Sequence, residues 1–316
     1  WNCCNGWLCK TIPNSGVLVG LLAPYYHKKR GLGKIWTIKR GSATPFYNRS
    51  MRQRCDFMSE LTFFSDFTSL SQKDAGKWVE KCSTLAEAAL KDSSHKVHVL
   101  ANVLLLEQYF NTWRQGLQKE GKELAPVVSI TMELLWDYLF GKKKPSEFDS
   151  YANCLYACTL EYLVGEELII EEQNEFYQKY FNHIDFQTIP WVVLSSAAVL
   201  MLELVSIYGG KVEFDELKDC DEVSFLAIDD MLNQLNDVCV ELAGIECPSC
   251  FAKDVIKAMD EALVTPLFQS IVSKVQKSFL DAMNTEPQDY EKLREAYRQY
   301  AILPEEFVCD FLDYET

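Results

Sequence analysis

The cysteine pair with the spacing of a redox or zinc motif is Cys247-Pro248-Ser249-Cys250, at the start of a predicted helix. A helix N-terminus lowers the pKa of a nearby thiol, as in thioredoxin-like redox sites. Such a site also needs a strand directly before the motif, whereas residues 225–243 have the periodicity of a helix. A zinc site needs a second pair of ligands, and the flanking sequence offers none. We interpret the motif as a helix-opening turn, with redox or metal chemistry at Cys247 and Cys250 as the alternatives.

Histidines are the other candidate ligands in the sequence. The chain has four, of which His95 and His98 lie one helical turn apart. The sequence places no carboxylate to complete a metal site with them, so we interpret the pair as a solvated helix start. The chain also lacks a glycine-rich phosphate loop, a Gly-x-Ser-x-Gly elbow and a His-Glu-x-x-His motif. We therefore expect a protein that is not an enzyme and that holds no cofactor and no metal.

Carboxylates are concentrated in two short stretches, which are the predicted partner-binding residues. One stretch contains Glu166, Glu167, Glu171, Glu172 and Glu175, and the other contains Asp215, Glu216, Asp219, Asp221 and Glu222. These stretches fit either a solvated, solubilising surface or a docking surface for a basic protein, whose association a focused negative potential accelerates. Binding of nucleic acid by this part of the chain is disfavoured, because the phosphates would be repelled.

Charge divides the chain near residue 55. The first 55 residues contain ten Lys or Arg and no Asp or Glu, whereas the remainder contains all 46 acidic residues and 21 basic ones. We therefore divide the chain into an irregular basic N-terminal segment, residues 1–57, and an acidic domain, residues 58–316. Three explanations of the basic segment stay open: Met58 begins the natural protein, the segment is an arm that binds an anion or a partner, or it is a targeting sequence.

The twelve cysteines do not have the spacing of a disulfide framework. Cys82, Cys154, Cys158 and Cys239 fall on the apolar stripes of predicted helices, where a free thiol packs as a small hydrophobic group. A reducing compartment is the simpler explanation of this pattern. We therefore expect a cytoplasmic protein.

Apolar periodicity predicts helices along the whole acidic domain. The expected helices cover residues 71–90, 95–118, 122–140, 146–163, 166–181, 190–208, 225–243, 249–263, 266–283 and 285–300, and a short one begins at Pro304. Gly141 and Gly209 are expected to end helices, and Ser146 and Thr285 to begin them. Strand periodicity is nearly absent. The predicted fold class is therefore all-α, a stacked bundle of about ten helices preceded by the basic segment.

The longest apolar run, residues 189–202, is interrupted by Pro190 and ends before Glu203. It is shorter than the roughly 18 residues that a membrane-spanning helix needs. We expect it to form a buried central helix, and we expect no association with a membrane.

The stretch LLWDYLFGK at residues 134–142, followed by a polar turn and an acidic helical hairpin, resembles the small all-helical immunity proteins of bacterial polymorphic toxin systems and the YjaG-type helical family. The resemblance covers about residues 95–181 and includes no catalytic residue of either family. It implies a cytoplasmic, non-enzymatic protein that binds and blocks a toxin, and an acidic surface suits a basic nuclease. The sequence therefore favours a soluble interaction protein, with a thiol-dependent redox enzyme and a structural subunit of a larger helical assembly as alternatives.

Deletion of residues 1–57 is expected to leave a domain that folds cooperatively, because charge and composition change together at residues 56–60. Thermal melting followed by circular dichroism measures this in the truncated chain. Loss of the cooperative transition would show that the boundary is wrong.

Overall fold

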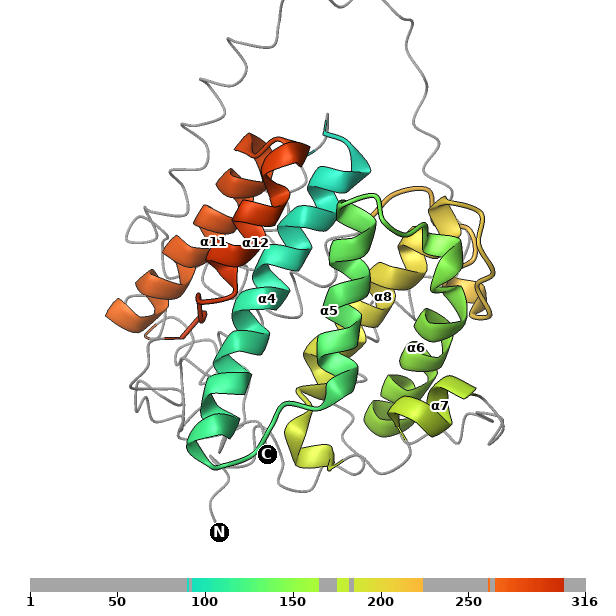
Figure 1. Cartoon of the computed structure of the whole chain (residues 1–316), viewed down its shortest axis with the longest axis horizontal. Coiled ribbons are helices and arrows are strands. Elements are labelled where there is room, and N and C mark those ends of the chain that lie inside the picture. The colour runs from blue at the N-terminus through green and yellow to red at the C-terminus, as the bar shows by residue number, and fades with distance from the viewer. Residues whose placement is uncertain are drawn as a thin grey trace, which may run out of the picture.

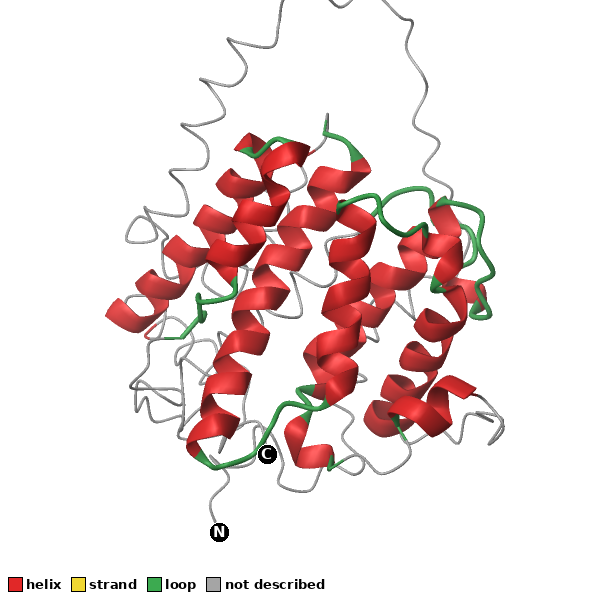
Figure 2. Ribbon diagram, in the orientation of Figure 1, coloured by secondary structure: helices red, strands yellow, loops and turns green. Residues whose placement is uncertain are grey.

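The computed structural model describes residues 90, 93–164, 175–181, 185–223, 261 and 265–303, which are mostly helical and contain no strand. The α-helices of these residues are α4 (His95–Lys119), α5 (Pro126–Leu139), α6 (Asp149–Val164), α7 (Glu175–Tyr180), α8 (Trp191–Ile207), α11 (Pro266–Asn284) and α12 (Tyr290–Tyr297) (Figures 1 and 2). The all-α prediction is confirmed for this part of the chain. The basic segment and the helices expected at residues 71–89, 225–243 and 249–260 lie outside it.

The helices form a bundle in which α4 occupies the centre (Figure 1). In Figure 1, α4 lies between α5 on one side and the pair formed by α11 and α12 on the other. Contacts join α4 to α5, α8, α11 and α12, and α6 packs along α8. Within the described residues, no helix has both the length and the apolar composition that crossing a membrane requires.

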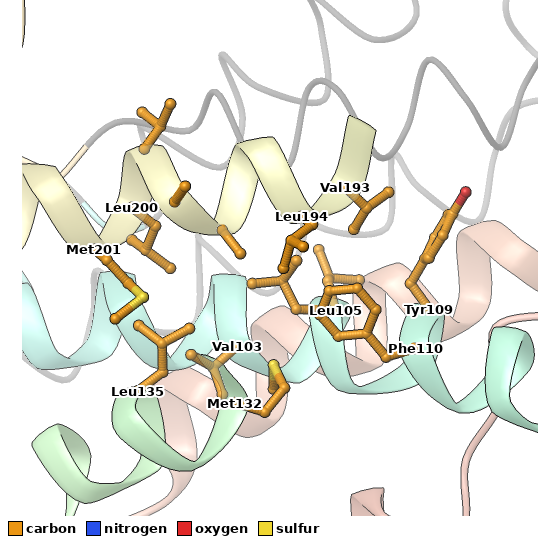
Figure 3. Close-up of a cluster of buried hydrophobic side chains, with 14 of the residues drawn as sticks. Val103, Leu105, Tyr109, Phe110, Met132, Leu135, Val193, Leu194, Leu200 and Met201 are labelled. Carbon is orange, nitrogen blue, oxygen red and sulfur yellow. The ribbon is translucent and has the colours of Figure 1, made fainter. Parts of the chain in front are cut away.

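Side chains of α4, α5 and α8 meet in one apolar core. Figure 3 shows Val103 and Leu105 of α4 with Leu135 of α5 and Leu194 and Met201 of α8, and each of these side chains is at least 95% buried. Burial of one such side chain contributes about 1.5–3 kcal/mol to stability. The apolar run that the sequence marks as a central helix is α8, and its residues Val193 to Val205 are all buried.

The central helix α4 is buried around its whole circumference. The sequence predicts an apolar face covered by two neighbouring helices, but every residue from Val99 to Trp113 is buried. The helix therefore brings polar side chains into the interior as well as apolar ones. A buried polar group without a partner costs about 1–3 kcal/mol, so these side chains require hydrogen bonds from the surrounding elements.

Four buried polar residues of α4 form such hydrogen bonds with other elements, and we call them the polar strip. They are Glu107, Gln108, Asn111 and Thr112. The indole Nε1 of Trp136 on α5 donates to Glu107 Oε2 at 2.9 Å. Gln108 Nε2 donates to Ser278 Oγ on α11 at 2.7 Å. These bonds fix the position of α4 against the helix on each side.

The other half of the polar strip holds the chain after α12. Asn111 Nδ2 donates to the carbonyl oxygens of Tyr297 and Tyr300, at 2.8 and 2.9 Å. The backbone N–H of Ile302 donates to Thr112 Oγ1 at 2.9 Å. The carbonyls at the end of a helix have no partner within the helix, and here a side chain of α4 provides one.

The helix ends that the sequence predicts at two glycines are confirmed, whereas some of the predicted helix starts differ from those observed. Gly141 and Gly209 follow α5 and α8 with φ of 71° and 73°, in the left-handed region that glycine favours. The helix α5 begins at Pro126, four residues after the expected start. Proline suits a first helical position because it has no N–H to leave unpaired.

Two predicted helix starts are also corrected. Ser146 lies in a 3-10 turn, residues 145–147, and α6 begins at Asp149. Thr285 was expected to begin a helix, but it ends α11, and its N–H bonds to the carbonyl of Asp281 at 3.0 Å. A second 3-10 turn, Pro287–Asp289, then leads into α12.

Replacing Asn111 by Ala is expected to lower the free energy of unfolding by about 1–3 kcal/mol, because one buried carbonyl and one partly buried carbonyl lose their donor. Asn284→Ala is the matched control, since that amide donates to Leu280 O on an exposed surface, and we expect a change within about 0.5 kcal/mol. Urea denaturation measures both variants. Equal effects of the two substitutions would contradict a structural role of the polar strip.

Candidate functional site: an anchored acidic loop

The second predicted acidic stretch lies in a loop after α8, residues 211–223, which we call the acidic loop. Its exposed acidic side chains are Glu213, Asp215, Asp219, Asp221 and Glu222. Glu216 lies with Asp215 in a 3-10 turn, Asp215–Leu217. The acidic loop leaves the end of α8 and lies against the beginning of α6, at the upper right of Figure 1.

Asn153, on the first turns of α6, holds the beginning of the acidic loop. Its Nδ2 donates to Lys211 O at 2.8 Å, and its Oδ1 accepts from the N–H of Glu213 at 2.8 Å. One side-chain amide therefore satisfies a carbonyl and an N–H of the loop backbone, as a neighbouring strand would. The Asn153 side chain is buried, so the loop is bound to an internal residue of the bundle.

Ser206, on the last turn of α8, holds the end of the acidic loop. Its Oγ donates to Lys218 O at 2.7 Å and accepts from the N–H of Cys220 at 3.1 Å. The hydroxyl thus donates a hydrogen bond to one loop residue and accepts one from another. Both ends of the loop are fixed by side chains of the two helices that pack most extensively against each other, α6 and α8.

Apolar side chains fix the acidic loop between these polar anchors. Val212, Leu217 and Val223 are buried in the core. The ring of Phe214 meets Tyr156 of α6 edge to face, with 4.6 Å between the ring centroids. Because alternate parts of the loop face inward, its carboxylates are held on the outer surface.

Two lysines neutralise part of the negative charge. Lys218 Nζ lies 2.6 Å from Asp215 Oδ1, and this hydrogen bond and the lysine's charge hold the pKa of Asp215 below its usual value. Lys211 Nζ lies 2.7 Å from Glu213 Oε1, and that hydrogen bond raises the pKa of Lys211. These exposed pairs contribute little to stability.

Three further carboxylates of the acidic loop have no cationic partner among the described residues. Within the part of the chain that the structure describes, the side chains of Asp219, Asp221 and Glu222 form no ion pair and no hydrogen bond. They are exposed and lie close together in the sequence. Their charges therefore add to a local negative potential that acts on an approaching cation.

An exposed aromatic side chain adjoins the acidic loop. Tyr208, which follows α8, is 51% exposed, although large hydrophobic side chains are mostly buried in this fold. Its hydroxyl lies 3.0 Å from the hydroxyl of Tyr138 on α5, and the two rings meet edge to face. Burial, followed by the hydrogen bond to Tyr208, raises the pKa of Tyr138. This contact fixes the ring of Tyr208 while leaving much of its surface accessible.

Of the remaining predicted site residues, the structure describes Glu175 alone. Glu175 is the first residue of α7. Glu166, Glu167, Glu171, Glu172, Cys247 and Cys250 lie outside the described residues. His98 Nε2 lies 2.6 Å from Leu90 O, close to the helix start expected for the histidine pair. Among the described residues, no group of three or more His, Cys, Asp or Glu side chains is arranged to hold a metal ion.

Sequence reasoning found the charges of the acidic loop but missed its anchors. Asn153 lies 58 residues before Lys211 and Ser206 lies 12 residues before Lys218, and both belong to helices whose patterns were interpreted mainly from apolar residues. No local pattern marks Asn153 as such an anchor, because Cys154 lies on the apolar stripe and residues i and i+1 of a helix do not share a face.

Comparison with protein-family models gave no match, and comparisons with curated proteins and with solved structures gave no significant match.

Asn153→Ala is expected to release the start of the acidic loop, because Lys211 O and the N–H of Glu213 both lose a partner. The amide of Glu213 should exchange with solvent about tenfold faster, which corresponds to the loss of about one buried hydrogen bond. Hydrogen exchange followed by mass spectrometry measures this, with amides of α4 as the internal control. An unchanged rate at Glu213 would show that the amide of Asn153 does not hold the loop.

Proposed function

We propose that the chain is a non-enzymatic protein that binds a basic protein partner through the acidic loop. The observation that carries the proposal is the anchoring of the loop: Asn153 and Ser206 hold its backbone while Asp219, Asp221 and Glu222 stay exposed. A purely solubilising surface needs negative charge but does not need that charge in a fixed arrangement. A binding surface gains from the negative charge and also from its fixed arrangement, because a loop that is already ordered loses less conformational entropy when a partner docks.

Tyr208 supports the same proposal. Tyrosine is enriched at the energetically important positions of protein interfaces, and its ring attracts the cationic groups of lysine and arginine. An exposed tyrosine shortly before the acidic loop in the chain, together with the exposed carboxylates of that loop, therefore suits a partner surface rich in those residues. The negative potential accelerates encounter, and the aromatic contact slows dissociation.

The resemblance of residues 95–181 to immunity proteins suggests the kind of partner. A basic toxin blocked by this chain is the specific form of the proposal.

We also propose a cytoplasmic location. Cys154 supports it, because this residue is a free thiol and reduced cysteines are typical of that compartment.

Asp219→Asn combined with Asp221→Asn tests the proposal directly. The variant should associate about two- to tenfold more slowly at low salt with the basic protein that co-purifies from the source cells, and its salt dependence should be weaker. Association rates at two ionic strengths, measured by stopped flow, decide this.

Glu120→Gln combined with Glu123→Gln is the matched control, because it removes the same charge from the exposed turn between α4 and α5. That turn lies at the opposite end of the bundle from the acidic loop (Figure 1). The control should keep most of the association rate. Equal slowing in both variants would indicate an effect of net charge alone and would contradict docking at the acidic loop.

A further inference from the structure

Three consecutive lysines follow α5, in a chain whose net charge is −15. We call these residues, 142–144, the lysine turn. Lys142 and Lys144 are exposed, and Lys143 is half-buried. Lys142 Nζ lies 3.8 Å from Glu291 Oε1 on α12, but within the described residues the side chains of Lys143 and Lys144 form no ion pair. These two lysines therefore present positive charge that no described carboxylate of the chain neutralises.

Backbone hydrogen bonds hold the lysine turn in place. The N–H groups of Lys142 and Lys143 donate to Asp137 O, at 2.8 and 3.2 Å. The N–H of Lys144 donates to Glu147 Oε2 at 2.7 Å. Like the acidic loop, the lysine turn thus carries its charges on an ordered backbone, which lowers the conformational entropy that docking would cost.

The lysine turn and the acidic loop lie at the same end of the bundle (Figure 1). Gly210, directly before the acidic loop, packs so closely against Ser146, two residues after the lysine turn, that a Cβ on Gly210 would lie 3.6 Å from Ser146 Cα. Tyr208 also connects the two segments, since its hydroxyl lies 3.0 Å from that of Tyr138 in the last turn of α5. We call the surface formed by the lysine turn, Tyr208 and the acidic loop the end face.

Opposite charges on the end face are neighbours but are not paired with each other. Within the described residues, no ion pair joins a lysine of the lysine turn to a carboxylate of the acidic loop. A basic partner would neutralise only the acidic loop, and an acidic partner only the lysine turn. A second copy of the chain carries both charges, and a two-fold axis brings each segment against its complement twice.

We propose that the chain forms a two-fold symmetric dimer through the end face, in which the lysine turn of each copy contacts the acidic loop of the other. Tyr208, which is 51% exposed, adds an aromatic contact of the kind that protein interfaces favour. The net charge of −15 repels two copies at long range, so the local charge pairs must outweigh that repulsion.

The dimer does not rest on the proposed function, because no other protein takes part in it. It has a consequence for that function, since the dimer covers the acidic loop. A second copy and a basic partner therefore compete for the same surface.

Charge reversal of each segment in the full chain tests the dimer. Lys143→Glu with Lys144→Glu, and Asp219→Lys with Asp221→Lys, each place like charges against each other in both contacts. Either double variant should dimerise at least about 100-fold more weakly than the wild type, because like charges across an interface are strongly unfavourable. An equimolar mixture of the two variants should form a dimer again, since both contacts then join opposite charges. Sedimentation velocity over a range of concentrations measures all four samples.

Net charge alone predicts a different pattern. The lysine variant makes the chain more negative and the aspartate variant makes it less negative, so general repulsion would weaken dimerisation in the first and strengthen it in the second. Glu120→Lys with Glu123→Lys is the matched control, because it changes the net charge as the aspartate variant does, at the opposite end of the bundle (Figure 1). The control should dimerise at least as tightly as the wild type.

Hydrogen exchange tests the wild-type chain without any substitution. As the concentration rises, exchange should slow in residues 142–148 and 211–223 and stay constant in the turn at residues 120–123. A wild-type chain that is monomeric at about 100 µM would overturn the proposal. Unchanged dimerisation in either charge-reversed variant, a mixture without a dimer, concentration-dependent protection outside the end face, or oligomers that grow beyond two copies would each do the same, because a two-fold contact closes at the dimer.

Discussion

Burial of α4 on every side is the constraint on which the rest of the described structure depends. A helix that is buried around its whole circumference can carry polar side chains only where its neighbours pair with them. Glu107 and Gln108 meet this requirement with Trp136 of α5 and Ser278 of α11, and Asn111 meets it with the carbonyls that end α12. The polar strip thereby specifies which element lies on each side of α4. Apolar contacts alone would specify this arrangement less strictly.

The same requirement explains how an acidic surface is held on a helical bundle. Seven of the charged side chains of the acidic loop face water, but its backbone lies against α6 and α8 and needs partners there. Asn153 and Ser206 provide them from within the bundle. The loop therefore combines a fixed backbone with accessible carboxylates, and this combination distinguishes it from a surface whose charge serves solubility alone.

Local patterns in the sequence predict the helices but not the contacts between them. Periodicity identified α4, α5 and α8, and the positive φ of Gly141 and Gly209 explains why the ends of α5 and α8 were found. The expected start of α5 lay four residues too early, because the stretch before Pro126 also has helical composition, whereas the helix begins at the proline. The partners of Asn111 and Asn153 lie up to 189 residues away in sequence, so no local pattern indicates that these amides are buried anchors.

The most direct test of the account is a hydrogen-exchange footprint of the full chain, alone and with the basic protein that co-purifies from its source cells. Docking at the acidic loop predicts slower exchange in residues 211–223 and beside Tyr208, with little change along α11 and α12, whose outer surfaces lie away from the loop (Figure 1). Protection confined to α11 and α12, with the acidic loop exchanging as in the free chain, would contradict the account.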